Sequence, residues 1–590
     1  MTILLTAVVL GGLDCSGGES NASASRATPN TWRFHGTTAE TNLPQGKVFV
    51  AERPFAITLR PRSSPAHELV APRPAGCGCA DLGFVSATGR ARVTSWAPTG
   101  RGSTLTGPAH LSDGTTATMR IDATRDRGVH IVLRPPARSP RPSAWELAIP
   151  HSRNEGIYGL TERIVDDYNQ SELEPAEVGS LDRTGEIVKM YVTPTISGYA
   201  PFFQSSRGYG VLVDGTMPGT YDVAHSDPAI TRVTFELPQR GPSAVEASIH
   251  LFVGDHLAIL DQFTRLTGRP VQPPDAVFTH WRGRDEDPVG KPVQWHGIPI
   301  NPTVAEDLAA YERARIPPGI FHFDRPWAIG SEGYGDLVWD PARFPNAQRM
   351  LAEMRRVGWK IEVWVSPWVL DAPNAYAKAH GYLAPNSTRA LDLTNPDAVA
   401  WEERRIVAFL RGPEGRYVDG FFLDRGDEFD VSSQATDIYH DGRSGREIHN
   451  AYPVLYERMF HDALVKARGT THGNANGWLL ARPSYTGSQA YVVRWPGDTH
   501  SRTGVLIPEQ PETSASTDKG LRSYLISMQR AAFMGTDFIG SDTGGYSQWN
   551  DKDLYARWIE VSALSPLMRF HGKGAAPSDA NSDGTTDTTL

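Results

Sequence analysis

Between residues 31 and 255, apolar residues occur in short β-branched or aromatic runs that are separated by Gly- and Pro-containing turns. The clearest runs are Lys47–Val50, Phe55–Leu59, Val129–Leu133, Tyr209–Val213, Val233–Leu237 and Ala247–Phe252. Short runs of this kind with few long helical periods are typical of antiparallel strands. We therefore predict a β-sandwich over residues 31–255.

The pattern changes after His256. Leu257–Thr267 has helical periodicity, and Pro273-Pro274 forms a stiff boundary behind it. Strand-like and helix-like segments then alternate, which predicts βα units around a parallel sheet. The predicted strands are Ala276–Trp281, Gly319–Asp324, Lys360–Val365, Tyr417–Asp424, Leu479–Ser484, Tyr491–Trp495 and Asp537–Asp542.

The helices between these strands carry end signals. Thr303 and Glu306 form a capping box that predicts a helix over Val304–Ala314. Ala347–Val357 and Asp397–Leu410 each follow an Asn suited to N-capping, and each is followed by a Gly. This alternation predicts a (β/α)8, TIM-type barrel over residues 256–572.

Only seven barrel strands can be counted. Residues 573–590 are polar and small, and such a tail can bury almost nothing. We therefore expect a disordered tail over 573–590 and a barrel that lacks its last strand.

The N-terminal residues 1–30 are predicted to be a signal and tether. An apolar run to Leu10 precedes Cys15 and a Ser-rich stretch, which predicts export to the periplasm, the cell surface or the medium, with Cys15 as a candidate lipid anchor. Asp14 and the absence of a preceding Lys or Arg leave an alternative open, in which the chain starts inside a longer leader.

Composition excludes several other classes. The net charge of −9 leaves no basic surplus for a nucleic-acid partner. Three cysteines, Cys15, Cys77 and Cys79, cannot form a disulfide framework or a four-cysteine zinc site. No His-x-His or His-Glu-x-x-His motif is present, so we predict no metal and no cofactor.

Two carboxylates stand where apolar runs end. Asp424 closes the run that begins at Tyr417, and Asp498 follows the run Tyr491–Trp495. The strand ends of an α/β barrel are where its catalytic side chains lie. A pair of carboxylates is also the minimum that cleavage of a glycosidic bond requires.

Several motifs together resemble those of glycoside hydrolase family 31, the α-glucosidase and α-xylosidase type of enzyme. They are Gly156–Arg163, Leu266–Pro270, Pro273-Pro274, Phe344-Pro345 and Gly358–Lys360. The resemblance implies a β-sandwich, a (β/α)8 barrel and C-terminal β domains. The last strand and the C-terminal domains have no evident counterpart here, so the chain is interpreted as truncated.

The resemblance also implies roles for individual residues. Asp424 matches the nucleophile of a retaining glycosidase, and Asp498, in Trp495-Pro496-Gly497-Asp498, matches its acid/base. An acid/base needs a raised pKa so that it can protonate the leaving oxygen. The residues predicted to bind the sugar are Asp324, Phe422, Arg482, Trp495, Asp542, Arg569 and His571.

Two departures from the family pattern follow the nucleophile. Asp427 stands where the family usually has Glu, and Arg425 stands at a position that is more often apolar. Arg425 could favour an acidic or sulfonated sugar, or it could only pair with Asp427.

The leading hypothesis is an exported retaining hydrolase of α-glucosides or related oligosaccharides. A non-catalytic carbohydrate-binding protein, or an inactive truncated homologue, remains open. An α-glucan lyase or a sulfoquinovosidase-like enzyme is a third alternative. The sequence makes no prediction of oligomeric state.

Overall fold

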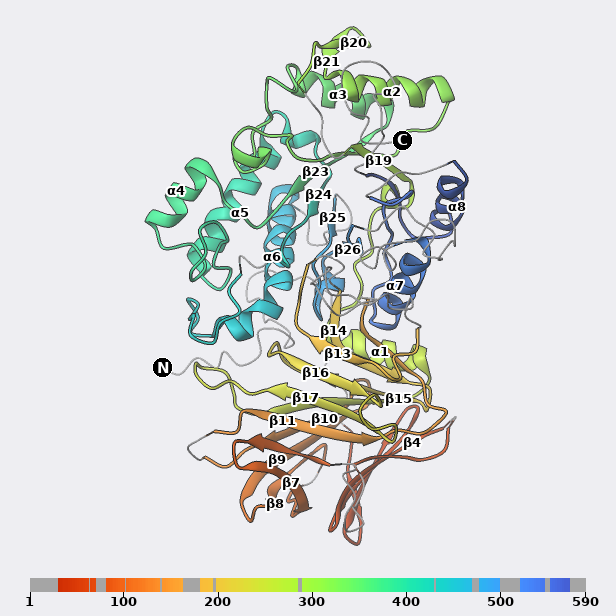
Figure 1. Ribbon diagram of the computed structural model, residues 1–590, viewed down its shortest axis with the longest axis vertical. Helices are drawn as coiled ribbons and strands as arrows, with labels where there is room; N and C mark the ends of the chain where they lie inside the picture. The colour runs from red at the N-terminus through yellow and green to blue at the C-terminus, as the bar shows by residue number, and fades with distance from the viewer. Residues whose placement is uncertain are drawn as a thin grey trace.

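The computed structural model describes residues 30–62, 64–70, 81–100, 102–137, 141–162, 181–194, 198–284, 289–428, 431–469, 477–498, 520–546 and 552–572. A β-rich region lies at the bottom of Figure 1, and a parallel sheet with most of the helices lies above it. The predicted signal segment with Cys15, the other two cysteines and the tail 573–590 lie outside the described residues, so those expectations stay predictions.

The N-terminal region is made of antiparallel strands, and the predicted sandwich is confirmed. A five-stranded sheet has the order β1-β2-β3-β4-β5. A thirteen-stranded sheet has the order β12-β14-β15-β18-β10-β9-β8-β7-β6-β11-β17-β16-β13. The bounds are β1 Arg33–His35, β2 Thr38–Leu43, β3 Gly46–Glu52, β4 Phe55–Pro61, β5 His67–Val70, β6 Leu82–Ser86, β7 Gly89–Trp96, β8 Thr104–Leu111, β9 Thr116–Thr124, β10 Gly128–Arg134, β11 Ala144–Pro150, β12 Ile157–Thr161, β13 Ile187–Met190, β14 Tyr199–Ser205, β15 Tyr209–Val213, β16 Gly219–Val223, β17 Ile230–Glu236 and β18 Ala247–Val253.

The alternation of buried and exposed residues along single strands explains how this region forms a hydrophobic core. In β9, Ala117, Met119, Ile121 and Ala123 are buried, while most residues between them are exposed. Side chains of a strand point alternately to its two faces, so one apolar face turns inward. Five of the six runs that the pattern singled out lie within strands, with β15 matching its run end for end, and the sixth, Val233–Leu237, extends one residue beyond β17.

The parallel sheet above the sandwich has the order β26-β25-β24-β23-β22-β19-β27. Its strands are β19 His280–Arg284, β22 Ile320–Phe323, β23 Lys360–Val365, β24 Gly420–Leu423, β25 Trp478–Ala481, β26 Val493–Arg494 and β27 Met568–Phe570. A separate small hairpin is formed by β20 Val293–Trp295 and β21 Ile298–Ile300. The predicted TIM-type barrel is thereby confirmed.

The expectation of a missing last strand is wrong. β27 pairs in parallel with β19, so Met568–Phe570 occupies the eighth position. The seventh position is residues 537–542, which make only isolated bridges: Ile539 pairs with Arg494, and Asp542 pairs with Arg569. The ring therefore closes, through a strand too short for its periodicity to be visible in the sequence.

The first barrel strand begins later than predicted. Residues Asp275–Phe278 form a 3-10 turn, and β19 starts only at His280. Pro274 precedes this turn with an extended backbone, and the turn ends when the Thr279 amide donates to the Ala276 carbonyl. The apolar run does lead into a strand, but its first residues form the 3-10 turn and the strand starts only after them.

Eight helices surround the sheets in the described part of the chain. Their bounds are α1 His256–Thr267, α2 Pro302–Ala314, α3 Ala347–Val357, α4 Asp371–Ala379, α5 Pro396–Arg411, α6 Gly445–Arg468, α7 Leu521–Phe533 and α8 Lys552–Ser562. Among these residues no helix combines the length and the apolar character needed to cross a membrane.

Two predicted helix starts have different caps from those expected. Asn301, not Thr303, caps α2, since its side-chain oxygen accepts from the amide of Thr303 at 3.0 Å. Asn346 precedes α3 but does not cap it, because its amide nitrogen donates to the Pro299 carbonyl at 2.8 Å. Asn395 does cap α5 as predicted.

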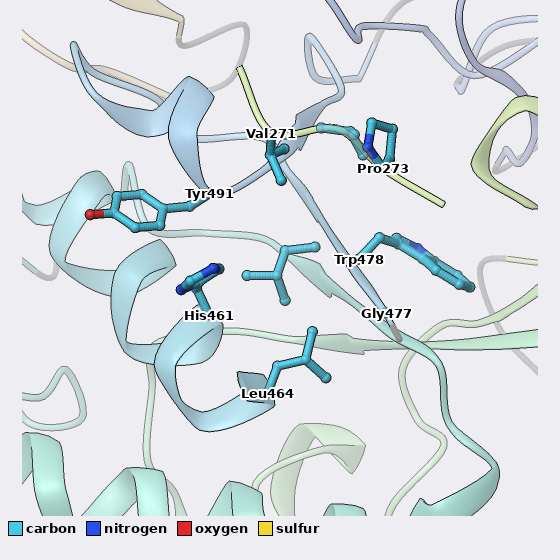
Figure 2. Close-up of a pocket in the computed structure, with 9 residues that line it drawn as sticks. Val271, Pro273, His461, Leu464, Gly477, Trp478 and Tyr491 are labelled. Carbon is cyan, nitrogen blue, oxygen red and sulfur yellow. The ribbon is translucent and has the colours of Figure 1, made fainter. Parts of the chain in front are cut away.

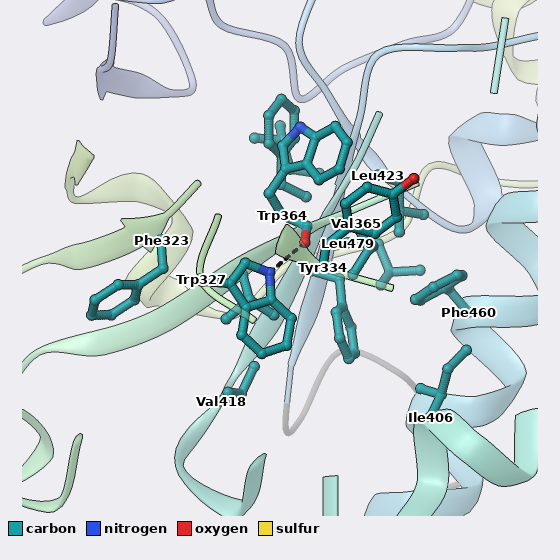
Figure 3. Close-up of a cluster of buried hydrophobic side chains, with 14 of the residues drawn as sticks. Phe323, Trp327, Tyr334, Trp364, Val365, Ile406, Val418, Leu423, Phe460 and Leu479 are labelled. Carbon is teal, nitrogen blue, oxygen red and sulfur yellow. Dashed lines mark hydrogen bonds between the residues drawn. The ribbon is translucent and has the colours of Figure 1, made fainter. Parts of the chain in front are cut away.

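The barrel core brings the carboxyl ends of neighbouring strands together. Phe323, Trp364, Leu423 and Leu479 are buried in one apolar cluster, shown in Figure 3. Trp327 fixes the loop after β22 to this cluster, since its indole nitrogen donates to the Trp364 carbonyl at 2.7 Å. The charged residues that follow β22, β24 and β25 are therefore held at one rim.

Candidate active site

Asp424 follows the last residue of β24 and is only 8% exposed. Its Oδ2 accepts a hydrogen bond from the indole of Trp364 at 3.1 Å. Its Oδ1 accepts from the backbone amide of Arg425 at 2.8 Å and lies 3.1 Å from Nη1 of Arg482. Donors from β23 and from the residues that follow β24 and β25 thus fix the orientation of this carboxylate.

Arg482 links Asp424 to the loop that follows it. The guanidinium donates to both oxygens of Asp427, at 2.7 and 3.0 Å, and to Glu428 at 2.8 Å. Burial alone would lower the pKa of Arg482, but the charges of Asp424 and Asp427 raise it above its usual value. Burial raises the pKa of Glu428, against the opposing effect of Arg482. Arg482 therefore stays a cation that holds several carboxylates in place.

Asp498 lies close enough to Arg482 for its charge to raise the pKa of that guanidinium. It is half-buried and is the last described residue before 499–519. Asp424 and Asp498 therefore act on the same guanidinium, one from the end of β24 and one from the loop after β26.

Asp324, directly after β22, receives two imidazoles. Nε2 of His322 lies 3.2 Å, and Nε2 of His571 lies 3.1 Å, from Oδ2 of Asp324. Burial would raise the pKa of Asp324, but these two hydrogen bonds hold it well below its usual value. The other nitrogen of His322 lies 2.9 Å from Glu362, and these two contacts raise the pKa of the buried imidazole despite desolvation. Asp324 is therefore a fixed anion at the carboxyl-end rim of the barrel.

A second buried carboxylate, Asp542, accepts hydrogen bonds from an arginine and a tryptophan. It accepts from Nη1 of Arg569 at 2.5 Å and from the indole of Trp495 at 3.1 Å. Burial raises the pKa of Asp542 to about 7, although both partners oppose the shift. The Arg569 guanidinium lies 4.3 Å from the ring centre of Phe422. Two nitrogens of Arg569 have no hydrogen-bond partner among the described residues, so they can donate to a ligand.

All nine predicted site residues therefore lie in the described part of the chain. Eight of them are joined by direct contacts or by one shared partner, and Asp498 joins them through its effect on Arg482. Their roles stay predictions, because proximity alone does not assign a catalytic step.

Three buried residues were not found from the sequence. His322 and Glu362 support Asp324, and Trp364 contacts the proposed nucleophile. The signal for His322 and Glu362 was visible, since each is an ionisable residue between apolar neighbours in a strand.

The two departures from the family pattern have different surroundings. Asp427 is 1% exposed and is held by Arg482. The guanidinium of Arg425 instead lies over the ring of Trp368, with 4.6 Å between its carbon and the ring centre. The sandwich motif at Gly156–Arg163 reaches the barrel through Glu162, which pairs with Arg494 at 2.6 Å.

A pocket at the opposite end of the strands is not this site. Figure 2 shows it lined by Val271, Pro273, Leu464, Trp478 and Tyr491, among others. Trp478 is the first residue of β25, so the pocket lies at the amino ends of the strands. Its lining is mostly apolar, and the proposed catalytic carboxylates are not among its residues.

Two described clusters have donor atoms spaced as for a metal ion: His322 with Asp324 and His571, and His130 with Asp214 and His250. In the first, both histidines already direct Nε2 at one oxygen of Asp324. In the second, the two imidazoles stack with 6° between their planes. Parallel stacked rings do not direct their nitrogen lone pairs at one common point, so neither arrangement is preorganised for a metal.

Comparisons with known proteins agree with this geometry. The model of the glycosyl hydrolases family 31 TIM-barrel domain matches residues 300–582. An alpha-xylosidase of Emericella nidulans is 26% identical over 391 residues, which cover 64% of this chain and 45% of that protein. Alpha-xylosidase XylQ of Lactiplantibacillus pentosus is 25% identical, covering 71% of this chain and 51% of that protein. The chain spans about half the length of these curated relatives.

Among solved structures, a family 31 sulfoquinovosidase from E. rectale, in complex with an aza-sugar inhibitor, has the same fold. Its TM-score is 0.64 at 17% identity, covering 92% of this chain and 78% of that one. The family match covers the barrel strands from β22 to β27 and all the strand-end residues described above. The barrel domain of this chain therefore belongs to glycoside hydrolase family 31.

Proposed function

We propose that this protein is a retaining α-glycosidase that hydrolyses α-glucosides or related α-glycosides by double displacement. The observation that carries the proposal is the setting of Asp424. Its two oxygens are oriented by Trp364, Arg482 and the Arg425 amide at the end of a barrel strand. A nucleophile that must attack along one direction needs such fixed orientation.

In the first step, Asp424 attacks the anomeric carbon, and Asp498 donates its proton to the leaving oxygen. The aglycone departs, and a glycosyl ester forms on Asp424. In the second step, Asp498 removes a proton from water, which attacks the anomeric carbon and releases the sugar. Both carboxylates interact electrostatically with Arg482, so one guanidinium stabilises the anionic form of each.

The remaining strand-end groups supply the sugar contacts. Asp324 is an anion with hydrogen-bond acceptors, while Arg569 retains donor nitrogens without described partners. A sugar hydroxyl both donates and accepts, so an acceptor and a donor in one pocket can bind vicinal hydroxyls.

A panel of 4-nitrophenyl α-glycosides tests the proposal. We expect release of nitrophenol by the wild type, and we expect Asp424→Ala to lose at least about a thousandfold in kcat. Asp553→Ala, at an exposed position on α8, is the matched control and keeps wild-type activity. No release by a wild-type protein with a folded circular dichroism spectrum would overturn the enzyme proposal in favour of a binding protein.

Product analysis separates hydrolysis from the lyase alternative. A hydrolase releases a sugar that contains one added water, and a retaining one releases it first as the α anomer. A product lighter by one water would indicate the lyase. A first-formed β anomer would show inversion and would contradict the nucleophile role of Asp424.

A further inference from the structure

A row of polar and glycine residues crosses the core of the barrel beside the strand ends of the site. In the register of the parallel sheet, His322 of β22 lies next to Glu362 of β23. Gly420 of β24 and then Trp478 of β25 continue the same row. The side chains of His322 and Glu362 have no exposed surface. Ionisable groups buried in a core cost free energy unless they are paired, and these two are paired with each other.

Two glycines give the side chains of this row their space. A Cβ atom at Gly420 would lie 2.6 Å from the indole nitrogen of Trp478, and one at Gly283 of β19 would lie 2.8 Å from the His322 ring. Both distances are well inside the roughly 3.5 Å of a van der Waals contact. Because β24 contributes no side chain here, the Trp478 indole reaches across it and donates to Oε1 of Glu362 at 2.8 Å.

Both ring nitrogens of His322 face a carboxylate. Nδ1 lies 2.9 Å from Oε2 of Glu362, and Nε2 lies 3.2 Å from Oδ2 of Asp324. A neutral imidazole has one N–H and one lone pair, so one of its nitrogens would face a carboxylate oxygen with no proton between them. With both nitrogens protonated, each contact becomes a charge-assisted hydrogen bond. Burial would lower the pKa of His322, but the two carboxylates raise it above its usual value.

The second imidazole on Asp324 has a different charge. Burial and the charge of Arg569 lower the pKa of His571 to about 3, so this ring donates from Nε2 as a neutral group. Its Nδ1 has no hydrogen-bond partner among the described residues, whereas Nδ1 of His322 meets Glu362. The titratable or charged groups that interact with His322 are Glu362, Asp324, Asp542, Arg569 and His571.

Asp324 keeps one acceptor position for a ligand. Its Oδ2 accepts from His322 and His571, and its Oδ1 accepts from the backbone amide of Arg325 at 2.6 Å. A carboxylate offers about four acceptor positions, so one on Oδ1 remains beyond those that described residues occupy. The torsion of an aspartate carboxylate is soft, and its orientation therefore depends on the donors that hold Oδ2.

We propose that Glu362 is a positioning residue for sugar binding, which acts through His322 to keep the Asp324 carboxylate ionised and turned so that Oδ1 meets one hydroxyl of the glycoside. The inference rests on the proposed function and adds to it a residue that does not touch the substrate. Glu362 is completely buried, so it acts on a sugar only through His322 and Asp324. Its carboxylate holds the imidazolium, and the imidazolium holds Asp324.

The kinetics of Glu362→Gln test the proposal, because glutamine has nearly the same shape as glutamate but no charge. We expect KM for the best nitrophenyl glycoside to rise at least about tenfold at pH 6, while kcat changes less than about threefold. A contact that binds the substrate and the transition state equally appears in KM and not in kcat.

The pH profile of the same variant separates positioning from simple packing. Burial raises the pKa of Asp324, but the two imidazoles hold it below its usual value. Removing the positive charge of His322 raises this pKa, so Asp324 is protonated at a higher pH. The acid limb of kcat/KM should therefore move to higher pH by about one unit in Glu362→Gln.

A rescue variant and a control accompany this measurement. Glu362→Asp should restore part of the acid limb, since it keeps the charge on a shorter side chain. Glu447→Gln is the matched control: Glu447 is a buried carboxylate of α6 that accepts from the hydroxyl of Ser243 at 2.6 Å, outside the contacts to Asp324. Its KM and its acid limb should equal those of the wild type.

Neutron diffraction from wild-type crystals tests the charge of His322 without any variant. We expect a hydrogen on both ring nitrogens of His322 at pH 7. A neutral His322 would overturn the inference, whether or not Glu362→Gln folds. A folded Glu362→Gln with the KM and the acid limb of the wild type would overturn it as well.

Failure of the proposed function has a different signature. Loss of all glycoside turnover in the folded wild type would refute that function and not the role of Glu362 in binding. Calorimetry of the wild type and of Glu362→Gln with D-glucose and D-xylose then tests the positioning role separately. Equal affinities of the two proteins, or no binding by either, would refute it.

Discussion

At the scale of single residues, the pKa values of two buried aspartates of this site are shifted in opposite directions. Asp324 is held as an anion because two imidazoles direct Nε2 at one of its oxygens. Asp542 is as deeply buried, yet desolvation wins over its two donors and raises its pKa to about 7. One can therefore accept hydrogen bonds from a sugar at any neutral pH, while the other changes charge near neutrality.

Trp364 is the residue whose role can be measured most directly. Trp364→Phe removes the N–H that donates to Asp424 but keeps an aromatic ring in the core. A hydrogen bond to a charged group contributes about 1.5–3 kcal/mol, so we expect kcat/KM to fall roughly 10- to 150-fold. Steady-state kinetics on the best nitrophenyl glycoside give this value.

Trp339→Phe is the control for that variant. Trp339 is also buried, but its indole nitrogen has no hydrogen-bond partner among the described residues. Equal losses in the two variants would show that packing of the core, and not the bond to Asp424, explains the effect.

At the scale of elements, strands and helices place ionisable groups where the local pattern alone would not. The long helix α6 carries Glu457 on a face that is completely buried against the barrel. Burial raises the pKa of Glu457 from 4.5 to about 8, although Ser488 and Arg494 oppose the shift. The carboxyl group is therefore protonated in the folded protein at neutral pH and ionised in the unfolded chain.

This difference predicts a pH-dependent stability. Folding takes up a proton between pH 4.5 and about 8, so the contribution of Glu457 to stability is present below pH 4.5 and is lost as the pH rises through 8. The slope is about 1.4 kcal/mol per pH unit in that window. The Glu457→Gln variant takes up no proton at this position on folding, so its free energy of unfolding relative to that of the wild type should rise with pH.

Thermal unfolding at pH 5.5, 6.5 and 8 measures the effect. The unfolding midpoint of Glu457→Gln, relative to that of the wild type, should rise with each increase in pH. The relative midpoint of Glu560→Gln, at an exposed position on α8, should not change. Parallel pH profiles of Glu457→Gln and wild type would contradict a raised pKa at this helix.

At the scale of the whole molecule, the sandwich and the barrel are joined by buried polar contacts. Glu162, after β12, pairs with Arg494 of β26 at 2.6 Å, and each side chain is 1% exposed. The Tyr199 amide donates to the Ser484 carbonyl at 3.1 Å, where Gly198 forms a bridge with Ser484. The strand that precedes Asp498 is thus supported from the sandwich, so the two regions act as one framework for the site.

Removing one partner of the buried pair should therefore destabilise the whole protein. Glu162→Gln leaves Arg494 without its counter-charge, which costs about 3–5 kcal/mol in a buried pair. Asp261→Asn, which weakens the exposed pairs with Arg265 and Arg269, should cost about 1 kcal/mol or less. Denaturant unfolding of both variants gives the comparison, and similar losses would show that the interface pair is not buried in solution.

Much of this fold could be predicted from the sequence because its periodicities are local. Alternation gave the sandwich strands, and the change to βα units gave the barrel, since side-chain direction follows the backbone with a fixed period. Asp424, Asp498 and Arg482 were found because an ionisable residue ending an apolar run is visible in a single segment. Errors arose where the local signal was weak, as in the short β27 and in the cap of α2.

The tertiary structure alone decided the relationships between segments far apart in the chain. Closure of the barrel depends on the pairing of residues 568–570 with 280–282, which no periodicity encodes. The opposite pKa shifts of Asp324 and Asp542 depend on the residues that other strands place beside them, because desolvation and hydrogen bonds act through space. In the same way, the sequence left open whether Arg425 favours an acidic sugar or pairs with Asp427, and only the tertiary structure placed its guanidinium over Trp368.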